Sequence, residues 1–253
     1  MDNYEKIKKY LSRINYKKQP RLDKETLDGL QTAHFESVPY ENLDILAGKP
    51  LSLDTGDLFE KIVENRRGGY CFELNGLYGW LLENIGFKVS DFTARFLYKE
   101  PAIPMRRHRV LVAETDVGRI LCDVGIGLET PRKSLYLKMN ETQNDGFNDY
   151  KITKDDSLGW VVNVREKGEW APYYSFTEEP QLPLDYVMPS FYCEKHPDSV
   201  FNKEPMVAIL TPDGRRSLDG TEFKKFVYGK DVVRTIPETE GEYKKLMSEY
   251  FGL

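Results

Sequence analysis

Apolar residues in the first third of the chain recur at intervals of three and four positions, the spacing of one helix face. One such stripe lies near the N-terminus, and a second follows Asp23, a residue suited to a helix N-cap. A third helix is predicted from about Asp57 to Asn65. After Gly68 and Gly69, the strongest stripe of the chain runs to Gly86 and contains Leu74, Leu77, Tyr78, Leu81, Leu82 and Ile85.

Near Lys88 the helical spacing gives way to short segments rich in β-branched and aromatic residues. Polar or glycine turns separate these segments, as in an antiparallel sheet or a small barrel. Residues 135–149 are polar and are predicted to form a loop or an irregular excursion. The predicted strands are residues 89–98, 108–113, 120–124, 160–164 and 170–176.

The last seventy or so residues mix both patterns. A short helix is predicted over residues 184–192, and strands over 207–210 and 223–228 lie around the turn at Pro212-Asp213-Gly214. A last helix is predicted after Pro237. Helices, then strands, then a mixed module indicate an α+β protein, with no internal repeat to suggest an array.

Composition narrows the classes of function. The 253 residues suffice for one large domain or two to three small ones. With 36 basic and 41 acidic residues the net charge is −5, which gives no general electrostatic reason to expect a nucleic acid or a membrane surface as partner. No apolar run approaches the roughly 20 residues that span a bilayer, and the N-terminus lacks the pattern of a signal peptide. Three cysteines make no disulfide framework, so a reducing cytoplasm is expected.

Cys71 is the most informative residue, because it follows two glycines and begins the strongest helical stripe. A thiol there faces unpaired backbone N–H groups and the positive end of the helix dipole, which favour thiolate. The same N–H groups could stabilise an oxyanion formed when the sulfur attacks a carbonyl. The alternative is a buried structural cysteine. Cys122 and Cys193 lack this context, and the absence of a C-x-x-C pair argues against a metal site.

A cysteine nucleophile needs a base, and His108 opens a predicted strand in which it shares a face with Val110 and Val112. If the following hairpin has an even loop, opposed residue numbers add to an odd total, as 108 and 123 do. His108 and Asp123 then share a face, directly opposed or diagonal by one pair. Pairing would orient the imidazole and remove the cost of burying an unpaired carboxylate. The alternatives are a structural aspartate at a strand end and a histidine paired on the surface.

Three further polar residues are assigned supporting or structural places. His34 is predicted to be a half-buried packing residue on its helix, and His196 to lie in a solvated loop. Glu41 is predicted to pair with Arg66 or Arg67 and so to brace the loop that carries the cysteine.

These residues together resemble the arylamine N-acetyltransferase family. The segment R-G-G-Y-C-F-E-L-N at 67–75 is similar to that family's R-G-G-x-C-F-E-x-N, which surrounds its nucleophilic cysteine. V-P-Y-E-N-L at 38–43 is similar to V-P-F-E-N-L, with Tyr40 where phenylalanine is usual. His108 and the D-V-G-I-G segment at 123–127 match the family's histidine and D-V-G-x-G, and residues 197–201 resemble its P-x-S-x-F.

The resemblance implies an α+β fold in three parts, with a catalytic core like that of cysteine proteases. An N-terminal helical bundle over residues 1–87 would carry the cysteine. A central antiparallel β-barrel over residues 88–180 would carry the histidine and the aspartate. An α/β lid would occupy residues 181–253.

The resemblance also implies a ping-pong transfer with acetyl-CoA as co-substrate. Cys71 would attack the thioester, CoA would leave, and an arylamine, a hydrazine or an N-arylhydroxylamine would take the acetyl group. His108 would assist proton transfer and Asp123 would hold its tautomer. Tyr40 and Ile126 would line the acceptor pocket, and the CoA contacts would include Gly125, Gly127 and Phe201.

Several alternatives stay open at this point. Tyr40 could be core packing, and Gly125 and Gly127 could simply end a strand. A polyanionic CoA calls for local basic residues, and the candidates, which could equally be solvated surface, are Lys203, Arg215, Arg216, Lys224, Lys225 and Lys230. The alternative functions are a macrolactam-forming amide synthase, an enzyme for another acyl-CoA, a transglutaminase-like cysteine amidase and a non-catalytic binding module. The sequence leaves the physiological acceptor and the oligomeric state open.

Overall fold

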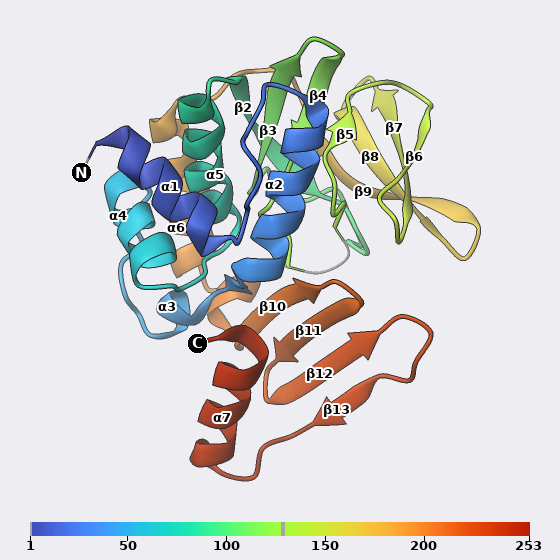
Figure 1. Ribbon diagram of the computed structural model, residues 1–253. Coiled ribbons are helices and arrows are strands. Elements are labelled where there is room, and N and C mark those ends of the chain that lie inside the picture. The colour runs from blue at the N-terminus through green and yellow to red at the C-terminus, as the bar shows by residue number, and fades with distance from the viewer. Residues whose placement is uncertain (1, 128–129) are drawn as a thin grey trace.

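The computed structural model, which describes residues 2–127 and 130–253, is an α+β protein in which helices, one large sheet and one smaller sheet follow each other along the chain (Figure 1). The N-terminal helices pack on one side of the large sheet. The smaller sheet and the last helix lie apart from the large sheet, at the other end of the molecule. Within the described residues, no helix is both long enough and apolar enough to cross a membrane.

The N-terminal part is helical, as predicted. Asp23 caps its helix by accepting a hydrogen bond from the Thr26 N–H. The helix predicted from Asp57 begins two residues earlier, at Thr55, and changes at Glu60 into a π-helical turn that ends at Glu64. The helices are α1 (Asn3–Arg13), α2 (Lys24–Ser37), α3 (Leu43–Leu46), α4 (Thr55–Phe59) and α5 (Cys71–Ile85).

Eight antiparallel strands form a nearly closed barrel in the order β5-β4-β3-β2-β9-β8-β7-β6. The Gln143 side chain on β6 joins the two edges of this sheet, because it accepts from the Tyr136 N–H (2.7 Å) and donates to the Tyr136 carbonyl (2.9 Å) on β5. The strands are β2 (Lys88–Phe96), β3 (His108–Thr115), β4 (Gly118–Cys122), β5 (Leu135–Tyr136), β6 (Thr142–Asn144), β7 (Asp149–Asp155), β8 (Gly159–Glu166) and β9 (Glu169–Phe176).

The loop predicted over residues 135–149 is wrong in part, because this segment contains β5, β6 and the first residue of β7. β5 and β6 are only two and three residues long, and β6 consists of polar residues at the sheet edge. So short a polar strand carries no apolar alternation that a sequence pattern could detect.

The C-terminal part contains a five-stranded antiparallel sheet in the order β1-β10-β11-β12-β13. The short strand β1 (Tyr40–Glu41) joins it from the N-terminal part, with Tyr40 paired to Ala208. The helix predicted over residues 184–192 is a 3₁₀ turn (Pro183–Tyr186) followed by α6. The other elements are α6 (Val187–Lys195), a 3₁₀ turn (Val200–Asn202), β10 (Met206–Thr211), β11 (Gly214–Asp219), β12 (Glu222–Val227), β13 (Val233–Thr235) and α7 (Glu240–Phe251).

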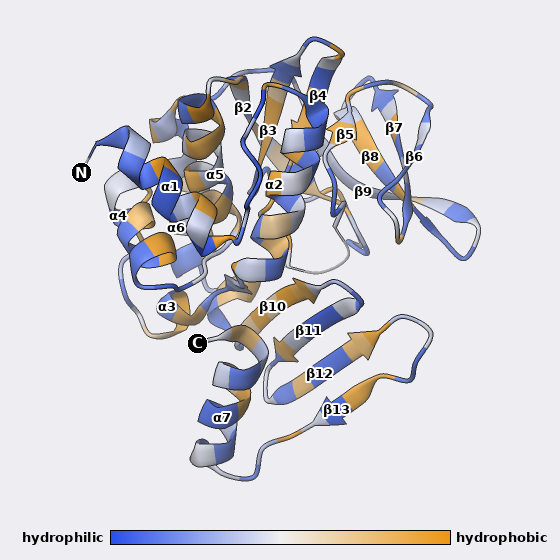
Figure 2. Cartoon of the chain, in the orientation of Figure 1, coloured by the Kyte–Doolittle hydropathy of each residue, from blue (hydrophilic) through white to orange (hydrophobic). Residues whose placement is uncertain are grey.

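The strands predicted at 207–210 and 223–228 are confirmed as β10 and β12, but β11 and β13 were missed. The turn at Pro212–Gly214 therefore connects β10 to β11. Figure 2 shows β10 as largely hydrophobic and much of β11 as hydrophilic. Because Arg215 and Arg216 stand side by side in β11, its apolar alternation is too weak to predict a strand.

Strand β3 separates two hydrophobic cores. Leu111 and Ala113 pack against the helices in a cluster that includes Leu77 and Leu81 of α5. Val110 and Val112 point into the barrel instead and pack there with aromatic side chains. His108 lies two residues before Val110 on the same strand, so its side chain lies on the barrel side of β3 as well.

His34 is wholly buried, deeper than the predicted half-buried position. Its ring lies between Tyr10 of α1 and Tyr78 of α5, at centroid distances of 6.0 and 5.8 Å. The two tyrosines come from other helices, so the spacing within α2 did not reveal this cover. Neither ring nitrogen has a hydrogen-bond partner among the described residues. Burial therefore favours the neutral ring and lowers the pKa of His34 to about 3.

This buried histidine predicts an acid-sensitive fold. An unfolded histidine has a pKa of about 6.5, so below that pH the unfolded chain binds more protons than the folded chain. The stability present above about pH 6.5 is lost as the pH falls toward 3, by about 1.4 kcal/mol for each pH unit from this group. His34→Phe should remove that slope in urea unfolding at pH 7, 6 and 5. His196→Gln, at an exposed histidine, should keep it, and equal slopes in wild type and His34→Phe would contradict the assignment.

Candidate active site

Cys71 is the first residue of α5 and its side chain is buried. Its sulfur lies 3.7 Å from the Arg107 carbonyl oxygen. Burial raises the pKa of the Cys71 thiol well above its usual value, and the nearby Cys193 and Asp123 raise it further. The backbone N–H groups of Phe72 and Arg109 act in the opposite direction. A thiolate here therefore depends on a neighbouring base that can take the proton.

His108 and Asp123 form the predicted pair. The His108 Nε2 lies 2.7 Å from Asp123 Oδ2, and the side chains are 4% and 2% exposed. The β3–β4 ladder ends with Leu111 opposite Cys122, so Asp123 follows one step later and His108 lies diagonal to it by one pair. This is one of the two arrangements that the hairpin parity predicted. Because Nε2 is engaged by the carboxylate, Nδ1 is the nitrogen left to exchange a proton.

Asn75, one turn after Cys71 on α5, anchors Asp123. Its Nδ2 donates to Asp123 Oδ1 (2.8 Å) and to the Arg109 carbonyl (2.6 Å), while its Oδ1 accepts from the Val124 N–H (2.9 Å). The Gly125 N–H also donates to Asp123 Oδ1, at 2.8 Å. Each carboxylate oxygen of Asp123 therefore has a defined partner, and the helix with Cys71 is bonded directly to the segment with Asp123.

Sequence reasoning assigned Asn75 no role, and it missed Gln31 altogether. Gln31 on α2 accepts from the Asp123 N–H (3.1 Å) and donates to the Pro131 carbonyl (2.7 Å). The asparagine of the R-G-G-x-C-F-E-x-N motif is the only sequence signal for Asn75. Nothing in the sequence indicates Gln31.

The loop before Cys71 is held by Glu41, as predicted, and its partner is Arg67. The Arg67 Nη2 lies 2.7 Å from Glu41 Oε1, which also accepts from the Gly68 N–H (3.2 Å). The other carboxylate oxygen accepts from the Leu43 N–H (2.9 Å). A Cβ at Gly68 would lie 1.9 Å from the Pro39 carbonyl oxygen, so the chain approaches itself too closely there for any other residue.

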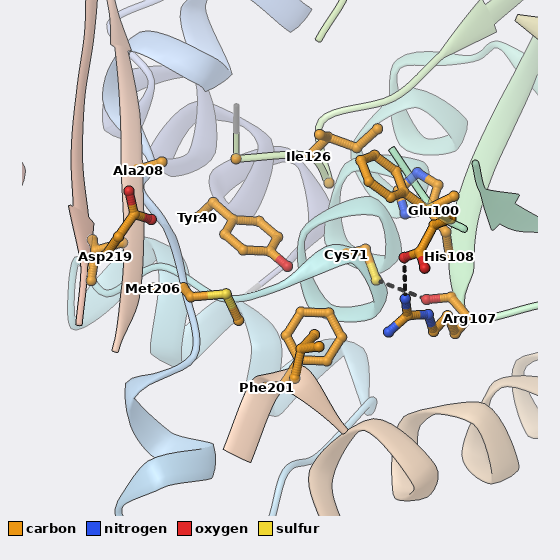
Figure 3. A pocket seen from close by; sticks show the side chains of 15 residues that line it. Tyr40, Cys71, Glu100, Arg107, His108, Ile126, Phe201, Met206, Ala208 and Asp219 are labelled. Carbon is orange, nitrogen blue, oxygen red and sulfur yellow. Dashed lines mark hydrogen bonds and ion pairs between the residues drawn. The ribbon is translucent and has the colours of Figure 1, made fainter. Parts of the chain in front are cut away.

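A cavity of about 230 Å³ lies in front of Cys71 (Figure 3). Asp123 does not line it and instead supports His108. Other lining residues were not predicted as site residues. They come from the end of β2, the segment before β3, the 3₁₀ turn at 200–202, β10 and the end of β11, and they include Phe96, Glu100, Arg107, Val200, Met206, Val207, Ala208 and Asp219. The predicted residues that do line it are Tyr40, Cys71, His108, Gly125, Ile126, Gly127 and Phe201.

Gly125 and Gly127 allow close packing around the cysteine. A Cβ at Gly125 would lie 2.5 Å from Asn75 Nδ2 and 2.8 Å from Cys71 Cα. A Cβ at Gly127 would lie 2.7 Å from the Tyr40 ring. The two glycines therefore let the segment after Asp123 lie directly against Cys71 and Tyr40, a structural role that holds whether or not they touch CoA.

None of the six predicted basic residues lines the cavity. Arg216 donates to the carbonyls of Glu249 (3.0 Å) and Tyr250 (3.3 Å) and so holds α7. Lys224 pairs with Asp219 at 2.8 Å and Glu222 at 3.1 Å. These two residues therefore have structural partners in the C-terminal part. Among the described residues no group of His, Cys, Asp or Glu side chains is arranged to hold a metal ion.

Comparisons with known proteins agree with this geometry. The family described as N-acetyltransferase matches residues 23–253. A Mycolicibacterium smegmatis protein named arylamine N-acetyltransferase is 39% identical over 220 residues, covering 83% of this chain and 78% of the relative. A Salmonella typhimurium relative named arylamine N-acetyltransferase / N-hydroxyarylamine O-acetyltransferase is 33% identical over 232 residues, covering 90% and 82%.

Solved structures give the same result. The arylamine N-acetyltransferase from Salmonella typhimurium superposes with a TM-score of 0.93 at 30% identity, covering 100% of this chain and 92% of that one. The Mycobacterium marinum enzyme in complex with CoA gives 0.88 at 30% identity, covering 97% and 92%. The fold and site thus define an acyltransferase of the N-acetyltransferase class. Within that class, the chain belongs to the arylamine N-acetyltransferase family.

Because the Glu41 carboxylate holds the loop before Cys71, we expect Glu41→Ala to lose both stability and activity. The substitution leaves Arg67 and the Gly68 N–H without their buried partner, and we expect the free energy of unfolding to fall by about 3 kcal/mol. Urea unfolding and acetyl transfer should be measured together. Glu64→Ala, which breaks an exposed pair with Lys9, should cost less than about 1 kcal/mol. A Glu41→Ala protein with native melting temperature and full activity would refute the role.

Asn75 is a positioning residue, and Asn75→Ala should slow alkylation of Cys71 by iodoacetamide roughly 10- to 100-fold at neutral pH. Without Asn75 the Asp123 carboxylate and the imidazole that it orients lose their anchor, so the pH profile of alkylation should shift as well. Asn84→Ala, near the other end of α5, is the matched control. A lowered melting temperature with an unchanged alkylation profile would show that Asn75 is only structural.

Proposed function

We propose that this protein transfers an acetyl group from acetyl-CoA to the nitrogen of an arylamine or arylhydrazine through a thioester on Cys71. The convergence of Cys71 and His108 on one cavity, with Asp123 bonded to His108 from behind, carries the proposal. Membership of the arylamine N-acetyltransferase family supports the reaction class. The name of the Salmonella relative also supports transfer to the oxygen of N-arylhydroxylamines.

In the first half-reaction, His108 takes the Cys71 proton and the thiolate attacks the thioester carbonyl of acetyl-CoA. The bond to the CoA sulfur then breaks, and His108 returns the proton to that sulfur. Asp123 stabilises the imidazolium and holds the tautomer through its 2.7 Å contact with Nε2. Since burial raises the pKa of Cys71, the imidazole and its carboxylate are needed to form the thiolate at neutral pH.

In the second half-reaction, the acceptor nitrogen attacks the acetyl carbon on Cys71. His108 takes the proton that this nitrogen loses, the carbon–sulfur bond breaks, and Cys71 is released. We assign the stabilisation of the oxyanion in each tetrahedral intermediate to backbone N–H groups in the first turn of α5, at the positive end of the helix dipole.

Both substrates are assigned to the cavity. We place the pantetheine arm of CoA beside Gly125, Gly127 and Phe201, and the acceptor ring against Tyr40 and Ile126. The CoA complex of the Mycobacterium marinum relative supports binding of this donor by the same fold.

The division into a helical bundle (1–87), a β-barrel (88–180) and an α/β lid (181–253) is part of the same proposal. Strand β10 of the C-terminal part supplies residues that line the cavity, which supports its assignment as a lid. This strand pairs with β1, and β1 in turn bonds to Gly69 in the loop before Cys71. A cysteine-protease-like core is supported by a cysteine at a helix start that shares the cavity with a histidine at the start of a strand. The aspartate that bonds to this histidine directly follows the next strand. A cytoplasmic location fits three free cysteines.

Intact-protein mass spectrometry after brief incubation with acetyl-CoA, without acceptor, tests the proposal. We expect one acetyl increment, absent in Cys71→Ala, kept in Cys122→Ala and discharged by 4-anisidine. Absence of the increment from a folded protein would contradict acetyl-CoA as donor. Turnover of glutamine amides without CoA would instead indicate the cysteine amidase.

A further inference from the structure

One ion pair stands in an otherwise mostly apolar cavity. Arg107 Nη2 lies 2.7 Å from Glu100 Oε1, and both residues line the cavity with Cys71. The side chains are largely withdrawn from solvent, with 16% and 28% exposed. The other acidic lining residue, Asp219, pairs with Lys224 at 2.8 Å and is half exposed. Figure 3 draws Asp219 on the opposite side of the cavity from Arg107.

The Arg107 guanidinium faces the cavity. The backbone carbonyl oxygen of Arg107 lies 3.7 Å from the Cys71 sulfur, so Arg107 is next to the nucleophile. Burial raises the pKa values of the Tyr40 hydroxyl and the Cys193 thiol, and the positive charge of Arg107 acts on both in the opposite direction. Figure 3 shows the side chain extending its guanidinium toward the Phe201 side of the cavity.

Glu100 occupies only part of the guanidinium. The fork of an arginine carries five N–H donors, and Glu100 engages Nη2 alone. Within the described residues, no other side-chain hydrogen bond of Arg107 is formed. Glu100 therefore holds the side chain in place through one of the two Nη2 N–H groups. The other Nη2 N–H forms a fork with the N–H of Nε or Nη1, and this fork stays available to a ligand.

The neighbouring arginine differs. Arg106 lies 3.7 Å from Glu179 and does not line the cavity. Of two consecutive arginines, only one is placed beside Cys71, which makes Arg106 a matched control for Arg107.

We propose that Arg107, held by Glu100, binds a carboxylate on the acceptor, so that aminobenzoate-type arylamines are preferred over neutral arylamines. The proposal rests on the proposed function, because it assigns the acceptor class of the same site. A planar guanidinium fork matches a carboxylate in geometry and charge, and a partly desolvated pair is stronger than one in water. A cationic acceptor would instead place its charge against Arg107.

The test compares 3- and 4-aminobenzoate with the matching aminobenzamides, which keep the shape and remove the charge. In the wild type, kcat/KM should favour the carboxylates by about tenfold or more. Arg107→Gln should abolish this preference by raising KM for the carboxylates while leaving the amides nearly unchanged. Arg107→Lys should restore part of it, and Arg106→Gln should behave as wild type.

Two readouts separate this proposal from the proposed function. Acetylation of Cys71 by acetyl-CoA, measured by intact mass without acceptor, should be unchanged in Arg107→Gln. Calorimetric binding of 4-aminobenzoate needs no acetyl donor, so a loss of binding in Arg107→Gln supports the site even if no acetyl-enzyme forms. Melting temperatures, with the Glu100→Gln/Arg107→Gln double variant, exclude misfolding caused by an unpaired Glu100.

Three results would overturn the proposal. A raised KM for acetyl-CoA in Arg107→Gln would place the guanidinium on the donor. An equal loss for carboxylates and amides would make Arg107 structural. A wild type that neither prefers nor binds the carboxylates better than the amides would show that the free donors of Arg107 select no anion.

Discussion

The structure depends on the hydrogen bonds that join Asn75 to Asp123 and Val124. Cys71 belongs to a helix and His108 to a barrel strand, and these two elements could pack with many small differences in height and rotation. The Asn75 amide removes that freedom, because it donates to the Asp123 carboxylate and the Arg109 carbonyl and accepts from the Val124 N–H. The nucleophile and its base are thus aligned by a contact that neither of them makes.

A second layer of contacts holds the same region from outside. Glu41 fixes the loop before Cys71 through Arg67, and Gln31 holds the backbone of Asp123 from α2. Gly68 and Gly125 leave no room for a side chain at the two places where these segments touch. Buried, directional contacts from several elements therefore determine the surroundings of the Cys71 thiol. The same burial raises the pKa of this thiol well above its usual value.

Regular periodicity explains which features could be predicted from the sequence. The helical stripe that begins at Cys71 and the parity that puts His108 and Asp123 on one face are properties of single segments or of one hairpin, and both are confirmed. β6 and β11 escaped prediction because most of their residues are polar, so neither strand carries a clear alternation of apolar and polar positions. Gln31 and Arg107 were out of reach because their roles exist only once distant segments meet. The full burial of His34 has the same origin.

The pairing of β1 with β10 has a consequence for how the protein is made. Tyr40 is bonded to Ala208 as a strand neighbour, and both residues form walls of the cavity. Such contacts between remote segments raise the contact order and delay folding, since a long loop must close before they form. During synthesis the cysteine helix and most of the barrel leave the ribosome well before β10 does. The nascent chain therefore holds an open strand edge beside its nucleophile until the last fifth of the sequence arrives.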